Sequence, residues 1–170
     1  MSTQKRSNQI HIVLGLGRSG RSAARLLKSE GKNVLVLENN SNEKLINISN
    51  KLISEGINVI LLDKPLDINN FSPWIGRIDS VVVSPGIDWD HIALKELRSK
   101  NINVQGEVDL AWERLNHIPS IGITGTNGKT TVTNMLNHVL KLNSLKTDMG
   151  GNIGKALSKI ALERKLKDSQ

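Results

Sequence analysis

The stretch HIVLGLGRSGRSAARLLKSEGKNVLVLE, residues 11–38, decides the fold class of this chain. It starts with a short apolar run that ends in glycines. A segment with apolar residues at helical spacing follows and stops at Gly31, and a second apolar run closes on Glu38. This order predicts a strand, a helix and a parallel strand, which together form the βαβ unit of a doubly wound sheet.

The glycine-rich turn inside this unit has the spacing of a dinucleotide-binding loop. Gly15, Gly17 and Gly20 stand in G-x-G-x-x-G order, and Glu38 ends the next strand 18 residues after Gly20. Such glycines permit a tight turn and a close approach of backbone N–H groups to phosphate, and the acid suits ribose hydroxyls. The motif predicts a diphosphate site without choosing the nucleoside. The alternative is a tight strand–helix turn that binds nothing.

Strand-like and helical segments alternate along the rest of the chain. Further strands are expected at 57–62, 78–86 and 102–105, and helices at 42–56, 90–101 and 106–117. A new strand, glycine loop and helix begin at Ser120, and a strand at 146–150 and a helix from about Lys155 follow. We therefore expect residues 1–117 to form a Rossmann-like domain with a doubly wound parallel sheet. Residues 118–170 are expected to begin a second, incomplete α/β domain of the P-loop type.

The segment GTNGKTT, residues 125–131, is a second candidate phosphate loop. Backbone N–H groups at such a helix start converge on phosphate oxygens, a lysine reaches the β/γ-phosphates, and a threonine hydroxyl can bind Mg²⁺. The strict P-loop pattern needs glycine at position 123, which is Ile123 here, so this loop is a variant. The alternative is a strand–turn–helix junction whose lysine is merely solvated.

Composition narrows the class of protein. The chain has no cysteine, which excludes a disulfide framework, a thiolate metal site and a cysteine nucleophile. No stretch approaches the ~20 apolar residues that span a bilayer, and MSTQKRSNQ has no apolar core of a signal peptide. We therefore expect a cytoplasmic protein without membrane insertion. The net charge of +7 comes from scattered Lys and Arg, with no basic stripe interleaved with aromatics, so no nucleic-acid partner is expected.

Five motifs together resemble a known family. TGTNGKT (124–130) closely resembles the ATP loop of the Mur ligases, the ATP-dependent amide ligases of peptidoglycan synthesis, and GGNIG (150–154) is also typical of them. GLGRSG (15–20), SPGI (84–87) and GEVDL (106–110) resemble the branch that adds D-glutamate. The matches run in order from residue 11 to about residue 157 and cover most of the chain.

The resemblance implies a role for residues in both loops. It implies that the first domain holds the UDP part of the substrate rather than NAD, and that Lys129 acts on the phosphates as the catalytic residue with Thr130 near Mg²⁺. Asn40 departs from the family, which often has Arg there. The implied ATP loop is Gly125, Thr126, Asn127, Gly128, Lys129, Thr130 and Thr131. The implied substrate contacts are Gly15, Gly17, Arg18, Ser19, Glu38, Asn39, Ser84, Pro85, Gly86 and Asn152.

The reaction implied by the resemblance is an ATP- and Mg²⁺-dependent ligation of D-glutamate to UDP-N-acetylmuramoyl-L-alanine through an acyl phosphate. The missing C-terminal part of such a ligase would supply the D-glutamate pocket and further Mg²⁺ ligands, so we expect no turnover by this chain alone. Three alternatives stay open. The chain could be an NAD(P)-binding oxidoreductase or sensor domain, another Mur ligase or a folylpolyglutamate synthetase, or a remnant that binds a nucleotide without catalysis.

Overall fold

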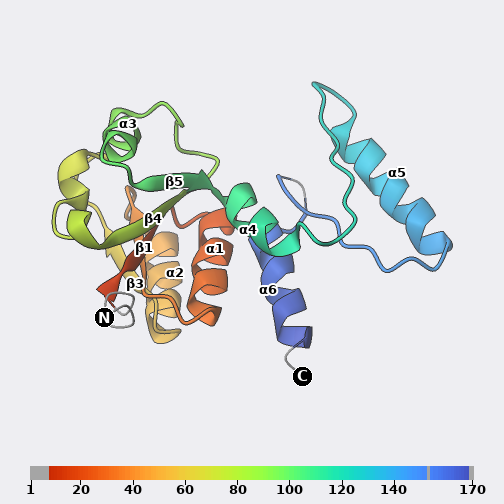
Figure 1. Cartoon of the computed structure of the whole chain (residues 1–170), viewed down its shortest axis with the longest axis horizontal. Helices are drawn as coiled ribbons and strands as arrows, with labels where there is room; N and C mark the ends of the chain where they lie inside the picture. The colour runs from red at the N-terminus through yellow and green to blue at the C-terminus, as the bar shows by residue number, and fades with distance from the viewer. Residues whose placement is uncertain (1–7, 153, 169–170) are drawn as a thin grey trace.

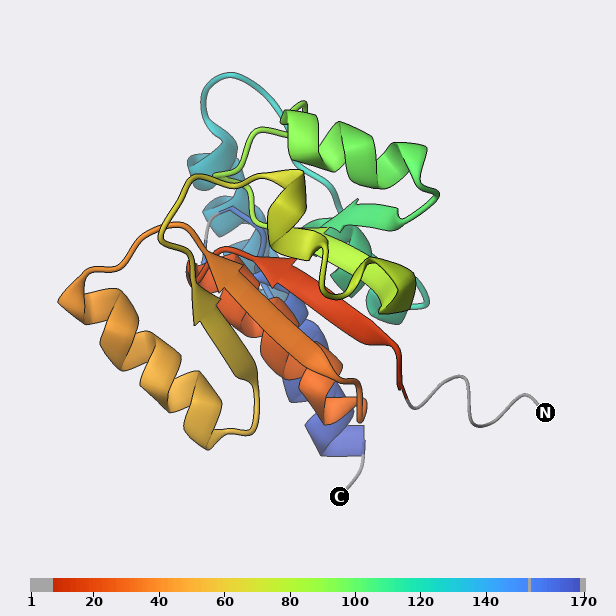
Figure 2. The ribbon, with the colours of Figure 1, turned by 90° about the vertical axis from the view of Figure 1, so that its left-hand side faces the viewer.

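The computed structural model describes residues 8–152 and 154–168. Its centre is a five-stranded sheet in which every neighbouring pair is parallel, in the order β3-β2-β1-β4-β5 (Figures 1 and 2). The strands are β1 (Ile10–Leu14), β2 (Val34–Glu38), β3 (Asn58–Leu61), β4 (Ile78–Val83) and β5 (Asn103–Gly106). The α/β class with a doubly wound parallel sheet is therefore confirmed.

The connections between strands are mostly helical, as expected of parallel strands. The helices are α1 (Arg18–Ser29), α2 (Glu43–Ser54), α3 (Ile92–Ser99), α4 (Glu107–Leu115), α5 (Lys129–Leu142) and α6 (Leu157–Asp168), with short 3₁₀ turns η2 (Ile68–Phe71) and η3 (Ile75–Arg77). No helix among the described residues is both long and apolar enough to cross a membrane.

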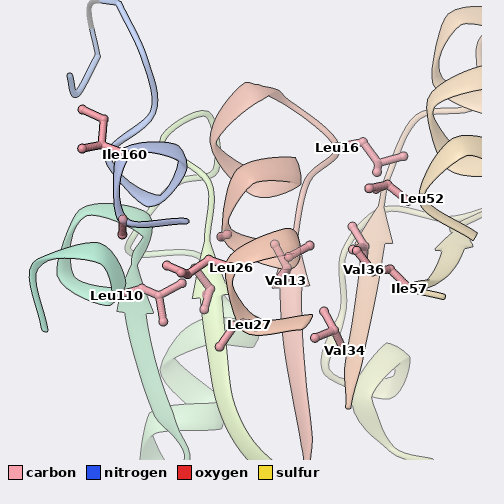
Figure 3. Close-up of a cluster of buried hydrophobic side chains, with 14 of the residues drawn as sticks. Val13, Leu16, Leu26, Leu27, Val34, Val36, Leu52, Ile57, Leu110 and Ile160 are labelled. Atoms are coloured by element: carbon pink, nitrogen blue, oxygen red, sulfur yellow. The ribbon is translucent and has the colours of Figure 1, made fainter. Parts of the chain in front are cut away.

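Each face of the sheet buries its own apolar core, which explains why β1 and β2 are apolar almost throughout. On one face, side chains of α1, α2, α4 and α6 meet the sheet, and Figure 3 labels Val13, Leu26, Leu110 and Ile160 among them. On the other face, η2 and α3 pack over the sheet around Phe71, which is fully buried. The sheet is thus enclosed on both sides, and its carboxyl edge is left to form a site.

The last helix, α6, packs against the first domain although it follows the predicted boundary at residue 118. It lies against α1 and α4, where Ile160 and Ala161 are each 4% exposed. Lys165 donates a hydrogen bond to the carbonyl oxygen of Ser29 at 2.6 Å. The chain therefore leaves the first domain to form α5 and packs against that domain again through α6.

Two predicted strands are wrong. Residues 120–124 and 146–150 form no strand, and beyond α4 the described residues contain one isolated parallel bridge, between Gly150 and Lys155. Two parallel strands need further neighbours and a covered face to bury their backbone and side chains. Helix α5 likewise packs against no sheet: it has no buried residue and lies apart from the five-stranded sheet in Figure 1.

Candidate nucleotide-binding site

A cleft of about 610 Å³ lies at the carboxyl ends of β1, β2 and β4. This is where open parallel sheets bind ligands, beside the strand at which the connections reverse direction. All ten residues predicted for substrate contact line this one cleft, although they come from four separate segments. They are Gly15, Gly17, Arg18, Ser19, Glu38, Asn39, Ser84, Pro85, Gly86 and Asn152. Their proximity is observed, whereas their roles remain predictions.

The three glycines of the first loop differ in their backbone conformation and in the space around them. Gly15 has φ +94°, a conformation that side chains disfavour. A Cβ on Gly20 would lie 2.0 Å from the carbonyl oxygen of Gly15, so α1 could not approach β1 as it does. Gly17 has ordinary φ and open space around its Cβ position, and it precedes the first turn of α1. The open side of Gly17 is where a phosphate could approach the helix N-terminus.

Glu38 stabilises the first loop through hydrogen bonds to its backbone. Its side chain is 9% exposed, one carboxylate oxygen accepts a hydrogen bond from the Leu16 backbone N–H at 2.7 Å, and the other accepts from the Asn40 backbone N–H at 3.0 Å. Sequence reasoning assigned Glu38 to the nucleoside. The structure adds that both oxygens already bind backbone N–H groups of the cleft wall, which links the ends of β1 and β2.

The β4 side of the cleft carries an unpaired hydroxyl. Ser84 Oγ is shielded from solvent and has no hydrogen-bond partner among the described residues, and it lies beside the Cβ positions of Gly15 and Gly20. Asp88 and His91 also line the cleft, and neither was among the predicted site residues. His91 Nδ1 accepts from the Ala93 N–H at 3.3 Å and caps α3. Their position just after the SPG turn is the signal that could have identified them.

Two glycines shape the second loop at the start of α5. Gly125 and Gly128 have φ of +146° and +75°, so each needs glycine, and Gly128 is the N-cap of the helix. The Lys129 ammonium turns back over the loop, donating to the Gly125 carbonyl oxygen and, at 3.2 Å, to that of Thr126. Thr130 and Thr131 are exposed in the first turn. These residues fit a bound polyphosphate.

The second loop does not line the cleft at the end of β1 and β2. Among the described residues that line the cleft, none comes from the 125–131 loop. The part of the chain that the structure describes also contains no cluster of three or more His, Asp or Glu side chains suited to a metal ion. Among the described residues beyond α4, Gly151 and Asn152 line the first cleft.

Both halves of the chain match domains of one family. Residues 9–106 match the domain described as "Mur ligase MurD-like, N-terminal domain", and residues 123–169 match the "Mur ligase middle domain".

Two curated relatives carry the name UDP-N-acetylmuramoylalanine--D-glutamate ligase. The protein of Prochlorococcus marinus strain NATL2A is 79% identical over 170 residues, which cover 100% of this chain and 36% of the relative. That of Synechococcus sp. strain CC9605 is 51% identical over 152 residues, which cover 89% of this chain and 33% of the relative. The chain thus spans about a third of the length of these relatives.

Solved structures support the fold. The murein peptide ligase of Psychrobacter arcticus 273-4 aligns with a TM-score of 0.52 at 22% identity over 80% of this chain and 27% of that protein. The UDP-N-acetylmuramate:L-alanyl-gamma-D-glutamyl-meso-diaminopimelate ligase of Neisseria meningitides aligns with a TM-score of 0.52 at 20% identity, over 87% and 45% respectively.

Proposed function

The chain belongs to the Mur ligase family, in its MurD-like branch, and from this premise we propose that its cleft binds the UDP part of UDP-N-acetylmuramoyl-L-alanine. In this proposal the chain is the part of a cytoplasmic ligase that holds this substrate and the phosphates of ATP. The whole ligase activates the alanyl carboxylate as an acyl phosphate and joins it to D-glutamate.

The proposal is carried by the proximity, in one cleft, of the ten residues for which the resemblance implies substrate contact. The first turn of α1 supplies unpaired backbone N–H groups and the positive end of the helix dipole, which favour a diphosphate. Gly17 leaves room for the phosphate to reach those N–H groups. Glu38 supports a nucleotide that uses the loop backbone, because its carboxylate already holds the loop and the neighbouring Asn40.

The second loop extends the proposal to ATP. Lys129 would neutralise the transferred phosphate, and Thr130 would give Mg²⁺ one of the six oxygens that it prefers. A bound Mg²⁺ would offset charge on the phosphates. We assign the remaining Mg²⁺ ligands and the D-glutamate pocket to the other two thirds of such a ligase, and we expect this chain to bind ligands without turnover. ADP release that requires both the UDP-sugar and D-glutamate would contradict that expectation.

The test is a thermal-shift titration with UDP-N-acetylmuramoyl-L-alanine, run in parallel with NAD⁺ and with UDP-N-acetylmuramate. Ligand at about 100 times its Kd should add about 2.7 kcal/mol of stability. Stabilisation by NAD⁺ alone would favour the oxidoreductase alternative and contradict the proposal. Tighter binding of UDP-N-acetylmuramate than of its alanyl derivative would favour another Mur ligase.

Paired glycine variants locate the binding site. Gly17→Ala and Gly76→Ala each place a methyl group in open space at an ordinary φ, but only Gly17 lines the cleft. We expect Gly17→Ala to weaken UDP-sugar binding and Gly76→Ala to leave it unchanged. Equal effects of the two variants would place the ligand elsewhere.

A further inference from the structure

Glu107 is a buried acid of the GEVDL motif to which no role has yet been given. It lies in the first turn of α4 and is 3% exposed. One of its carboxylate oxygens accepts two hydrogen bonds from Ser158, from the backbone N–H at 2.6 Å and from the hydroxyl at 2.5 Å. Ser158 lies in the first turn of α6, where backbone N–H groups have no partner within the helix. Glu107 therefore caps a helix that follows it by 51 residues.

The capped helix is joined to the turn that reaches the cleft. Gly151 N–H donates to the Lys155 carbonyl oxygen at 2.8 Å, which closes the turn directly before α6. A Cβ on Gly150 would lie 2.5 Å from Ile160 Cδ1, so this turn packs tightly on α6. Asn152, which follows Gly151 directly, lines the cleft.

A second contact fixes the turn at the cleft itself. Arg18 Nη1 donates to the Gly154 carbonyl oxygen at 3.0 Å, and Arg18 is the first residue of α1, within the GLGRSG motif. Arg18 thus holds the C-terminal side of the turn, and the buried Glu107 holds the start of α6, which follows it. These two anchors leave Asn152 facing the same cavity as Gly15 and Ser84.

We propose that Glu107 is a positioning residue that holds Asn152 in the substrate cleft by capping α6. This inference rests on the proposed function, because it assigns Glu107 to the binding of the same UDP-sugar. A buried carboxylate is costly unless its hydrogen bonds are made, so the Glu107–Ser158 contact selects one docked position of α6. The position of α6 in turn sets the position of the 150–155 turn.

A cap that served only overall stability would make a different prediction, and a double-mutant cycle separates the two. The variants are Glu107→Ala, Asn152→Ala and the combination of both, titrated with UDP-N-acetylmuramoyl-L-alanine by calorimetry. If Glu107 acts through Asn152, each single change weakens binding about tenfold, the scale expected for losing a hydrogen bond to a charged group. The double variant should then bind no more weakly than Asn152→Ala. The inference would be overturned if the double variant lost affinity by the product of the two single losses. It would also be overturned if Glu107→Ala bound the UDP-sugar as tightly as the unchanged chain.

The matched control is Asp109→Ala. Asp109 is exposed, lies in the same first turn of α4 and accepts a hydrogen bond from the Gly106 N–H at 3.0 Å, so its carboxylate caps α4 itself rather than α6. We expect Asp109→Ala to bind the UDP-sugar like the unchanged chain. Glu107→Gln keeps an acceptor oxygen for Ser158 and should restore part of the affinity. It also serves if Glu107→Ala does not fold.

Hydrogen exchange of the ligand-free protein tests the anchoring itself. Glu107→Ala should expose the amides of Gly151 and Ser158 to faster exchange, while amides of β1 and β2 stay protected. Unchanged exchange at Gly151 and Ser158 would overturn the anchoring. Failure of the unaltered chain to bind the UDP-sugar is a separate outcome, which contradicts the proposed function and with it the role of Glu107 in binding.

Discussion

Replacing Gly20 by alanine should disrupt the junction between the first loop and α1. The new Cβ would lie 2.0 Å from the Gly15 carbonyl oxygen and 2.9 Å from Ser84 Oγ. Ordinary contact begins near 3.4 Å, so the backbone atoms of Gly15 and Gly20 must separate by about 3.4 − 2.0 = 1.4 Å. The obstacle is a main-chain atom that no rotamer change can move, and α1 is held by Ala23 and Ala24, both fully buried.

We expect this change to lower the free energy of unfolding by about 3 kcal/mol, the upper end of the usual range for overpacking. For a chain of this length that corresponds to a loss of roughly 6–12 °C in Tm. Urea unfolding followed by circular dichroism measures the change, with the slope in urea checked for constancy. Gly17→Ala is the control, because its methyl group meets no atom within 4 Å. If Gly20→Ala unfolds within 0.5 kcal/mol of Gly17→Ala, the proposed steric reason for this glycine is wrong.

Three further predictions concern the second loop, a buried histidine and α6. Lys129→Ala should weaken Mg·ATP binding roughly 10- to 100-fold, the scale expected for losing a charged hydrogen bond. The free energy of unfolding in urea should stay unchanged. An unaltered ATP affinity would contradict the phosphate role of Lys129. Burial lowers the pKa of His11 below its ordinary 6.5, against an opposing effect of Asp79. The unfolded chain then takes up the proton more readily, so unfolding free energy measured in urea should fall as pH drops below 6.5, and His11→Asn should lose this slope. Ile160→Ala should lower the free energy of unfolding by about 2–4 kcal/mol and speed amide exchange in α6. Leu166, on the same helix, is 54% exposed, so Leu166→Ala should change stability by under about 0.5 kcal/mol. Equal losses in the two variants would contradict the docking of α6.

The first domain was predictable because its signals are local. Apolar runs of strand length and glycines at a fixed spacing follow one another within residues 11–38, and parallel strands with helical connections admit few arrangements. The strands expected at 120–124 and 146–150 failed for the opposite reason. A strand is stabilised by neighbours in a sheet, and an apolar run cannot show whether those neighbours are present.

The candidate site was predictable where backbone geometry demands a residue type, as at Gly15 and Gly128, both with positive φ. The supporting contacts were not predictable. Glu107 and Ser158 are 51 residues apart, and neither stands in a pattern that marks it as a partner of the other. The same holds for Glu38, whose spacing suggested a sugar contact but did not reveal its bonds to Leu16 and Asn40.

The docking of α6 also affects the order of events during synthesis. Leu26 and Leu110 belong to the same core as Ile160, yet Ile160 is made 45 residues after Leu115, the last residue of α4. At about 5–20 residues per second, that interval lasts roughly 2–9 s. Until Ile160 is made, the side chains of α1 and α4 that it covers lack this part of their core. The core that Leu26, Leu110 and Ile160 share is therefore completed only after residue 160 has been made.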